Sequence, residues 1–210
     1  MNLPNALTLL RIFFVPLLVA VLVEGNLRLS WNGSTILTNE FLALAIFLVA
    51  AATDLLDGYL ARRWKQITTV GMLFDPIADK LLISSALISL VQVRRIPAWM
   101  VVIIVGREFA VSGLRSIAAA EGYTIKASDL GKTKMVSQVF AIAMILVSVH
   151  WPVLTGFAML CMWLVVIFSV ISAVDYFQKF WGKVDERIKR RRRAELLVFE
   201  REERRRAAAE

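Results

Sequence analysis

Four aspartates lie within a short stretch of an otherwise apolar chain, and their spacing suits chemistry on a phosphate group. Asp54 and Asp57 are three residues apart, and Asp75 and Asp79 are four residues apart. Residues three or four apart share one face of a helix. A short polar segment separates the two pairs, so two antiparallel helices would bring all four carboxylates to one end of a bundle.

Carboxylates gathered at one point stay ionised only when a positive partner joins them. Oxygen ligands select hard divalent cations, and a single cysteine and a single histidine are too few for a zinc site. We therefore expect two Mg²⁺ ions, or Mn²⁺ in their place, because paired metal ions neutralise charge and orient oxygens during phosphoryl transfer. The alternative is that the aspartates cap helix ends and pair with nearby cations. Those cations are Arg62, Arg63, Lys65 and Lys80.

The rest of the chain predicts an all-α integral membrane protein. Of its 210 residues 58% are hydrophobic, and the mean hydropathy is +0.65, which is too apolar for an ordinary soluble domain. Apolar runs near the length that crosses a bilayer recur along it. We expect six transmembrane helices, with a polar loop at 25–39 between the first two. The expected spans are residues 7–24, 40–62, 75–93, 97–119, 133–149 and 153–176.

The distribution of lysine and arginine predicts that both ends of the chain lie in the cytoplasm. Segment 178–210 is rich in arginine and glutamate, so we expect a basic cytoplasmic C-terminal helix that follows a membrane domain at 1–177. This helix either binds anionic lipid headgroups or serves only to fix the orientation. No aromatic platform is interleaved with its arginines, which argues against nucleic acid as a partner. The pattern favours a bacterial inner membrane, with the aspartates facing the cytoplasm.

Eight residues around the aspartates match a known pattern at every defined position. The segment resembles the signature of the CDP-alcohol phosphatidyltransferases, D-x2-D-G-x2-A-R-x8-G-x3-D-x3-D. So many specified residues at fixed spacing make the resemblance highly specific, and the expected size and number of spans also fit. The matching residues are Asp54, Asp57, Gly58, Ala61, Arg62, Gly71, Asp75 and Asp79.

The resemblance implies a reaction in which a hydroxyl acceptor displaces CMP from a CDP-linked lipid with the help of two divalent metal ions. Asp54 and Asp75 would bridge both ions, and Asp57 would hold the first. Asp79 would hold the second ion and also take the proton from the attacking hydroxyl. The resemblance further implies a homodimer packed through membrane helices.

The resemblance also assigns a group of small and polar residues to the CDP-lipid. Arg62 would oppose the negative charge of the pyrophosphate, and the small residues would let a ligand approach closely. The segment Asn-x-x-Thr near the N-terminus is similar to a family element that lies near the nucleotide. The residues expected to bind the CDP-lipid are Asn5, Thr8, Gly58, Ala61, Arg62, Thr68 and Gly71.

Four cations later in the chain indicate the acceptor. Arg107 and Arg115 are eight residues apart and share a helix face, while Lys132 and Lys134 lie at the start of the fifth expected span. Cations at the ends of membrane helices suit an acceptor that is itself a phosphate ester. The segments around them resemble the phosphatidylglycerophosphate synthase branch, which implies CDP-diacylglycerol as donor and sn-glycerol 3-phosphate as acceptor.

Other interpretations stay open at this point. Within the same family the acceptor could be phosphatidylglycerol, as in a cardiolipin synthase, or inositol phosphate. Arg107 and Arg115 could instead pair with Glu108 or act only in topology. Outside the family, intramembrane aspartates could form the transport site of a divalent-cation transporter, although such sites lie near the bilayer midplane.

Overall fold

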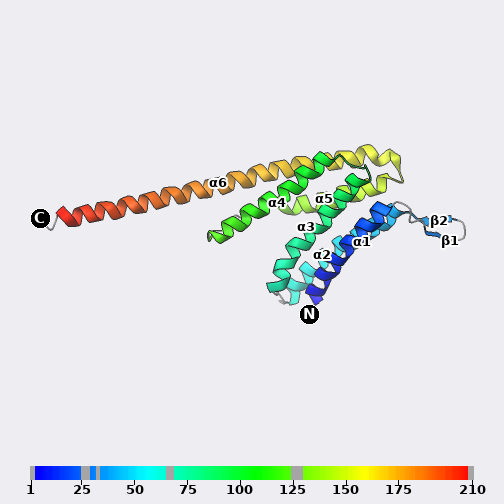
Figure 1. The fold of residues 1–210 in the computed structure, drawn as a ribbon, viewed down its shortest axis with the longest axis horizontal. Helices are drawn as coiled ribbons and strands as arrows, with labels where there is room; N and C mark the ends of the chain where they lie inside the picture. The colour runs from blue at the N-terminus through cyan, green and yellow to red at the C-terminus, as the bar shows by residue number, and fades with distance from the viewer. Residues whose placement is uncertain (1–2, 25–28, 32–33, 65–68, 124–129, 208–210) are drawn as a thin grey trace.

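The computed structural model describes residues 3–24, 29–31, 34–64, 69–123 and 130–207. Six long helices and one short β-hairpin make up this part of the chain (Figure 1). The elements are α1 Leu3–Glu24, β1 Leu29–Trp31, β2 Ser34–Leu37, α2 Asn39–Trp64, α3 Thr69–Gln92, α4 Ala98–Ala120, α5 Leu130–Ser148, the 3₁₀ turn η1 Pro152–Leu154 and α6 Thr155–Ala207.

The helices pack as two connected groups. In one group α1 contacts both α2 and α3, and in the other α6 contacts both α4 and α5. Contacts of α2 with α5 and of α3 with α4 join the groups. The shared core consists of apolar side chains that are almost fully buried, because these helices are apolar on the faces that meet. Its largest members include Leu18, Phe47, Leu82, Met100, Ile142 and Met162.

The C-terminal end of α4 is defined by a glycine. Gly122 has a φ of 76°, in the left-handed region that glycine adopts readily. The Gly122 amide donates to the Ala119 carbonyl, and the Tyr123 amide donates to the Ala118 carbonyl. This pair of bonds is a Schellman motif, which stops the helix and satisfies its last carbonyl groups. Tyr123 is thereby held beside the end of α4.

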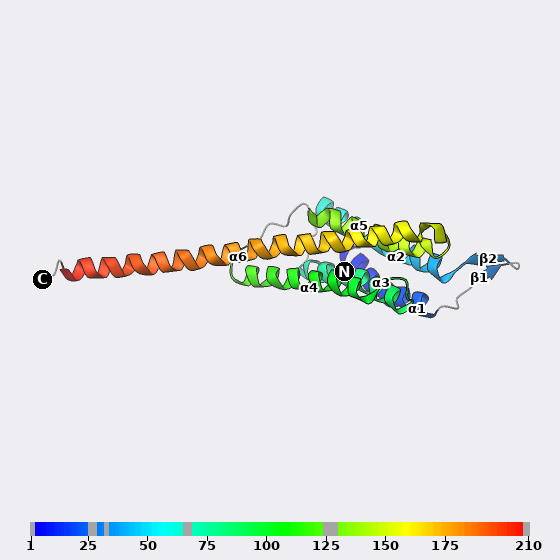
Figure 2. The ribbon, with the colours of Figure 1, turned by 90° about the horizontal axis from the view of Figure 1, so that it is seen from above.

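Helix α6 is much longer than the others and extends beyond the bundle (Figures 1 and 2). Arg187 of α6 contacts the end of α4, where its Nη1 donates to the Glu121 carbonyl at 2.8 Å and forms an ion pair with the Glu121 carboxylate at 3.0 Å. Its guanidinium also lies over the Tyr123 ring, 5.2 Å from the centroid. These contacts fasten the extended part of α6 to α4.

Two helices of the described chain are long and apolar enough to cross a bilayer, at residues 6–24 and 152–187. Large apolar side chains also point outward from the bundle, and the exposed fractions reach 67% at Phe13, 69% at Val102 and 94% at Val153. Outward-facing apolar surface on this scale suits contact with lipid. The structure and composition agree with a membrane protein.

The six helices coincide with the six expected apolar segments, so the all-α prediction is confirmed in outline. The expected loop at 25–39 is corrected in part, because it contains the antiparallel pair β1 and β2, with Ser30 opposite Thr35 and Trp31 opposite Ser34. The strands flank Asn32-Gly33, a dipeptide typical of hairpin turns.

The expected boundary at 177/178 lies inside the continuous helix α6. The domain division, the six spans and their orientation stay predictions.

Candidate active site

An ion pair between α1 and α2 fixes the first of the four aspartates. The Arg11 guanidinium is fully buried and pairs through Nη1 with Oδ1 of Asp54, whose side chain is 21% exposed. A buried charge is tolerated only when a partner compensates it, so this pair determines how α1 sits against α2. Thr8 lies one turn before Arg11 on the same face and is also buried. The polar face of α1 therefore points toward the aspartates.

The aspartates lie on the two helices that the sequence predicts. Asp54 and Asp57 are in the last part of α2, Asp75 and Asp79 are in the first part of α3, and a four-residue connection at 65–68 links the helices. The side chain of Asp79 is partly exposed. The side chains of Asp57 and Asp75 lie outside the described residues, and among the described side chains no group of three metal-ligating residues comes together.

Most of the expected CDP-lipid contacts also lie outside the described side chains. Asn5 belongs to α1, Thr68 is in the connection at 65–68, and the others belong to the facing ends of α2 and α3. The residues concerned are Asn5, Gly58, Ala61, Arg62, Thr68 and Gly71.

Asp54 is the described side chain of this region whose chemistry suits a divalent metal ion and that belongs to the α2 pair of the motif. Asp54 offers carboxylate oxygen, the ligand that hard cations prefer, and its exposed fraction leaves the group accessible. Arg11 balances one carboxylate charge and leaves the charges of three further aspartates in the same helix ends. The sequence analysis did not select Arg11, although an arginine inside an apolar span is a signal of a functional or paired residue.

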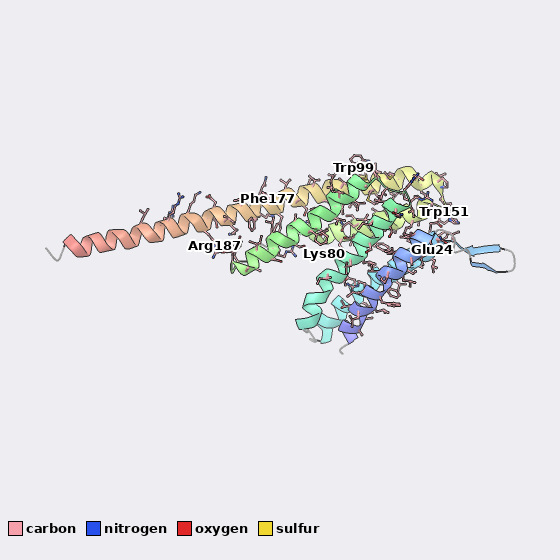
Figure 3. The ribbon with its side chains drawn as sticks, viewed as in Figure 1. Glu24, Lys80, Trp99, Trp151, Phe177 and Arg187 are labelled. Atoms are coloured by element: carbon pink, nitrogen blue, oxygen red, sulfur yellow. The ribbon has the colours of Figure 1, made fainter. Side chains whose placement is uncertain are left out.

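Lys80, directly after Asp79, reaches across to α4 (Figure 3). Its ammonium donates to Oγ of Ser112 at 2.5 Å, and the Ser112 hydroxyl donates to the Glu108 carbonyl at 2.7 Å. The sequence offered Lys80 as a pairing partner for the aspartates. The structure adds a specific partner on α4, so Lys80 also belongs to the polar surface of that helix.

Arg107 of α4 is partly buried and faces α6. Its Nη1 forms the expected ion pair with Glu108 at 3.3 Å, and its Nη2 donates to the Ser172 hydroxyl of α6. Its Nε is buried and has no hydrogen-bond partner among the described residues. The structure therefore contains the Arg107–Glu108 ion pair, and this pair does not use the Nε–H group of Arg107.

Arg115 lies two turns further along α4 and also faces α6. Its guanidinium is placed over the ring of Tyr176, 5.9 Å from the centroid, and the side chain is exposed. Lys80 contacts Ser112 of α4, and Arg107 and Arg115 lie on the same helix, so these three cations share one region of the structure. The side chains of Lys132 and Lys134, at the start of α5, lie outside the described residues.

The sequence analysis missed the α6 side of this region. Ser169, Ser172 and Tyr176 are all buried, and their spacing places them on one face of α6. A line of hydroxyl groups at helical spacing within an apolar span is a signal that could have identified them. The Tyr176 hydroxyl and the Ser169 hydroxyl have no hydrogen-bond partner within the described chain.

Comparison with known proteins identifies the family to which this arrangement belongs. Residues 1–171 match the family described as CDP-alcohol phosphatidyltransferase. The chain belongs to this family. Membership confirms the prediction made from the aspartate motif, and the family uses a divalent metal ion.

Two similar proteins illustrate the relationship within the CDP-alcohol phosphatidyltransferases. A Bacillus subtilis (strain 168) protein named CDP-diacylglycerol–glycerol-3-phosphate 3-phosphatidyltransferase is 40% identical over 190 residues, which cover 86% of this chain and 95% of that protein. A Mycobacterium tuberculosis protein named probable phosphatidylglycerophosphate synthase is 38% identical over 175 residues, which cover 83% of this chain and 79% of that protein.

A solved structure shares the fold. The crystal structure of Mycobacterium tuberculosis phosphatidylinositol phosphate synthase in apo form aligns with a TM-score of 0.58, and the alignment covers 86% of this chain and 90% of that one. The sequence identity is 18%, so this likeness concerns the fold alone. The roles of individual site residues stay predictions.

Proposed function

We propose that this protein transfers the phosphatidyl group of CDP-diacylglycerol to sn-glycerol 3-phosphate, giving phosphatidylglycerophosphate and CMP. The observation that carries the proposal is the complete aspartate motif on α2 and α3, beside an α4 helix that bears Arg107 and Arg115. Family membership and the names of the similar proteins support the same reaction.

We assign the four carboxylates as ligands of two Mg²⁺ ions, or of Mn²⁺. Bound there, the metals would neutralise charge on the reacting phosphate and orient its oxygens. Arg11 forms an ion pair with Asp54, and the buried guanidinium holds this carboxylate where α1 meets α2. The metal ligands in this proposal are Asp54, Asp57, Asp75 and Asp79.

Asp79 acts as the general base. It accepts the proton of the acceptor hydroxyl as the hydroxyl oxygen forms a bond to the β-phosphorus of the CDP-lipid. The bond between that phosphorus and the bridging oxygen of CMP breaks, and CMP leaves with the electron pair. Arg62 opposes the charge of the pyrophosphate throughout. The remaining CDP-lipid contacts are those predicted from the sequence: Asn5, Thr8, Gly58, Ala61, Thr68 and Gly71.

In this proposal the acceptor phosphate binds to four cations that come after the aspartate motif in the chain. Arg107 retains a buried Nε–H without a partner in the described chain, and Arg115 is exposed and open to a ligand. Guanidinium groups bind phosphate oxygens through charge-assisted hydrogen bonds. Lys132 and Lys134 complete this set in the proposal. An acceptor that carries a phosphate uses all four cations, whereas a neutral alcohol would leave them unmatched.

We further propose six membrane spans with both termini and the active site in the cytoplasm, in a bacterial inner membrane, and a homodimer. The distribution of lysine and arginine supports this orientation, and aromatic rings at the end of the bundle opposite the aspartates suit a membrane interface there. There the His150 ring lies 4.5 Å from that of Phe41, and Trp151 lies 5.8 Å from Phe41. Clustered aromatic rings at helix ends are typical of the membrane interface. They lie at the start of α2 and the end of α5, away from Asp54.

The test is CMP release by detergent-purified protein with CDP-diacylglycerol and Mg²⁺, measured with a panel of acceptors. The panel contains glycerol 3-phosphate, inositol phosphate, serine and phosphatidylglycerol. Release with glycerol 3-phosphate alone supports the proposal. Release with another acceptor would keep the aspartate chemistry but replace the acceptor. Failure with every acceptor, in a folded and metal-loaded sample, would contradict the proposed reaction.

A further inference from the structure

The polar side chains along α4 form a continuous strip with contributions from α3 and α6. Glu108, Ser112 and Arg115 follow one another at helical spacing along α4. Ser112 contacts Lys80 of α3, and Arg107 and Arg115 contact α6. Arg115 therefore stands where the two rows meet. We call this set the α4 polar strip, and it consists of Lys80, Arg107, Glu108, Ser112, Arg115, Ser172 and Tyr176.

The α4 polar strip carries more positive than negative charge. Lys80, Arg107 and Arg115 contribute +3 and Glu108 contributes −1, which leaves +2 on its members. The neighbouring Asp175 has its own partner, because Lys179 forms an ion pair with it at 2.7 Å. Asp79 precedes Lys80 directly, and in the proposed function the metal ions balance its charge. Charge at membrane depth is unfavourable without compensation. A ligand with two negative charges would balance the strip.

The strip also holds hydrogen-bond donors that the described chain leaves unused. Arg107 Nε and the Tyr176 hydroxyl are buried and lack partners among the described residues. Lys80 donates only to a serine hydroxyl in the contacts that the structure shows. A phosphate monoester offers three strong acceptor oxygens and close to two negative charges at neutral pH. Its chemistry matches both the charge and the donors of the strip.

We infer that Lys80 binds the acceptor phosphate, and that it makes the enzyme selective for acceptors that carry a phosphate monoester. The inference rests on the proposed function and adds a residue to its acceptor site. Without the acceptor, Ser112 Oγ accepts the hydrogen bond of the Lys80 ammonium. In the complex, a phosphate oxygen would accept from this ammonium. Lys80 follows Asp79 directly on α3. A phosphate held by Lys80 is thus tethered within one residue of the group that accepts the hydroxyl proton.

The experiment compares wild-type protein with Lys80→Met, which keeps most of the methylene stem but removes the charge. The KM for glycerol 3-phosphate is expected to rise by roughly 10- to 100-fold, in line with a lost charge-assisted hydrogen bond. The KM for CDP-diacylglycerol is expected to stay within about twofold. Lys80→Arg restores the charge and should recover part of the acceptor affinity. Lys179→Met is the matched control, because it removes a lysine from an exposed ion pair outside the strip.

A binding measurement separates this inference from the proposed function. Inorganic phosphate is titrated calorimetrically into wild-type, Lys80→Met and Lys179→Met protein in the presence of Mg²⁺, without CDP-diacylglycerol. We expect weaker binding only in Lys80→Met. Equal phosphate affinity in all three proteins, or no phosphate binding by the wild type, would overturn the role of Lys80. A wild type that binds phosphate through Lys80 but releases no CMP with glycerol 3-phosphate would overturn the proposed function alone.

Discussion

Arg11 of α1 and Asp54 of α2 form an ion pair whose guanidinium is completely shielded from solvent. The pair links the first helix of the chain to the first aspartate of the metal motif. Helix α1 also packs on α3, which carries Asp75 and Asp79. The contact therefore gives α1 a direct part in shaping the candidate metal site, beyond its role as a membrane helix.

Arg11→Met should lower stability more than any exposed substitution of similar size. Breaking a buried ion pair from one side typically costs about 3–5 kcal/mol, because the remaining charge loses its partner. We expect a clear decrease in Tm in detergent. Added Mg²⁺ should raise the Tm of the variant more than that of the wild type, because a bound cation replaces the lost charge beside Asp54. Arg95→Met, at an exposed position, is the control, and equal Tm values for both variants would contradict the prediction.

Asp79→Asn should abolish most CMP release while the protein stays folded. Loss of a general base lowers rates by about 10²- to 10⁴-fold, and the loss of a metal ligand adds to this. The measurement is kcat at saturating substrates, with Tm as the check on folding. A neighbouring acidic change, Asp175→Asn, removes a carboxylate from an exposed α6 pair and should leave kcat within about twofold. Wild-type turnover in Asp79→Asn would show that another group is the base.

Tyr176→Phe should affect acceptor binding more than stability. The hydroxyl is buried without a partner in the described chain, so its removal should change the free energy of unfolding by less than about 1 kcal/mol. The KM for glycerol 3-phosphate should rise about threefold to tenfold, the usual value of one neutral hydrogen bond. Tyr123→Phe, beyond the end of α4, serves as the comparison. A large fall in Tm with an unchanged acceptor KM would mean that the hydroxyl acts in packing alone.

Shortening α6 should separate the roles of two parts of its C-terminal half. Arg187 is the last α6 side chain for which the described chain shows a contact with another helix. A protein ending after residue 193 should keep the Tm of the full chain, whereas one ending after residue 183 should lose about 1 kcal/mol or less through the missing Arg187 contacts. Glu121→Gln in the full chain should reproduce most of that loss.

Sedimentation with phosphatidylglycerol vesicles, using fluorescently labelled peptide 188–207, tests whether the outer part also binds anionic lipid.

The sequence predicts the helices and the aspartate faces well, because both depend on local spacing. Apolar runs place α1 to α5 and the start of α6 to within about six residues, although α6 continues to Ala207, far beyond its apolar run. The spacing of Asp54, Asp57, Asp75 and Asp79 assigns them to the facing ends of α2 and α3. The family follows from the same local pattern. These features need no knowledge of how distant segments meet.

Pairs between helices are what the sequence does not reveal. Lys80 has aspartates one and five residues before it, yet its bond to Ser112 joins residues 32 positions apart. Arg107 and Ser172 are 65 positions apart. Tyr176 lies beside Arg115 because α6 packs on α4. Arg11 likewise pairs with Asp54 because α1 packs on α2. Such contacts depend on which helix faces meet, and helical periodicity gives faces but not neighbours.

The unbroken course of α6 has a mechanical consequence. Ser172 contacts Arg107 in the middle of α4, and Arg187 contacts the end of α4, 15 residues further along the same helix. At the rise of an α-helix this distance is about 22 Å. Residues 183–207 of α6 contain no glycine or proline. A movement of the charged outer end of the helix is therefore transmitted to Arg187 without a hinge. The outer end of α6 is therefore connected by a continuous helix to the Arg187–Glu121 contact at the end of α4.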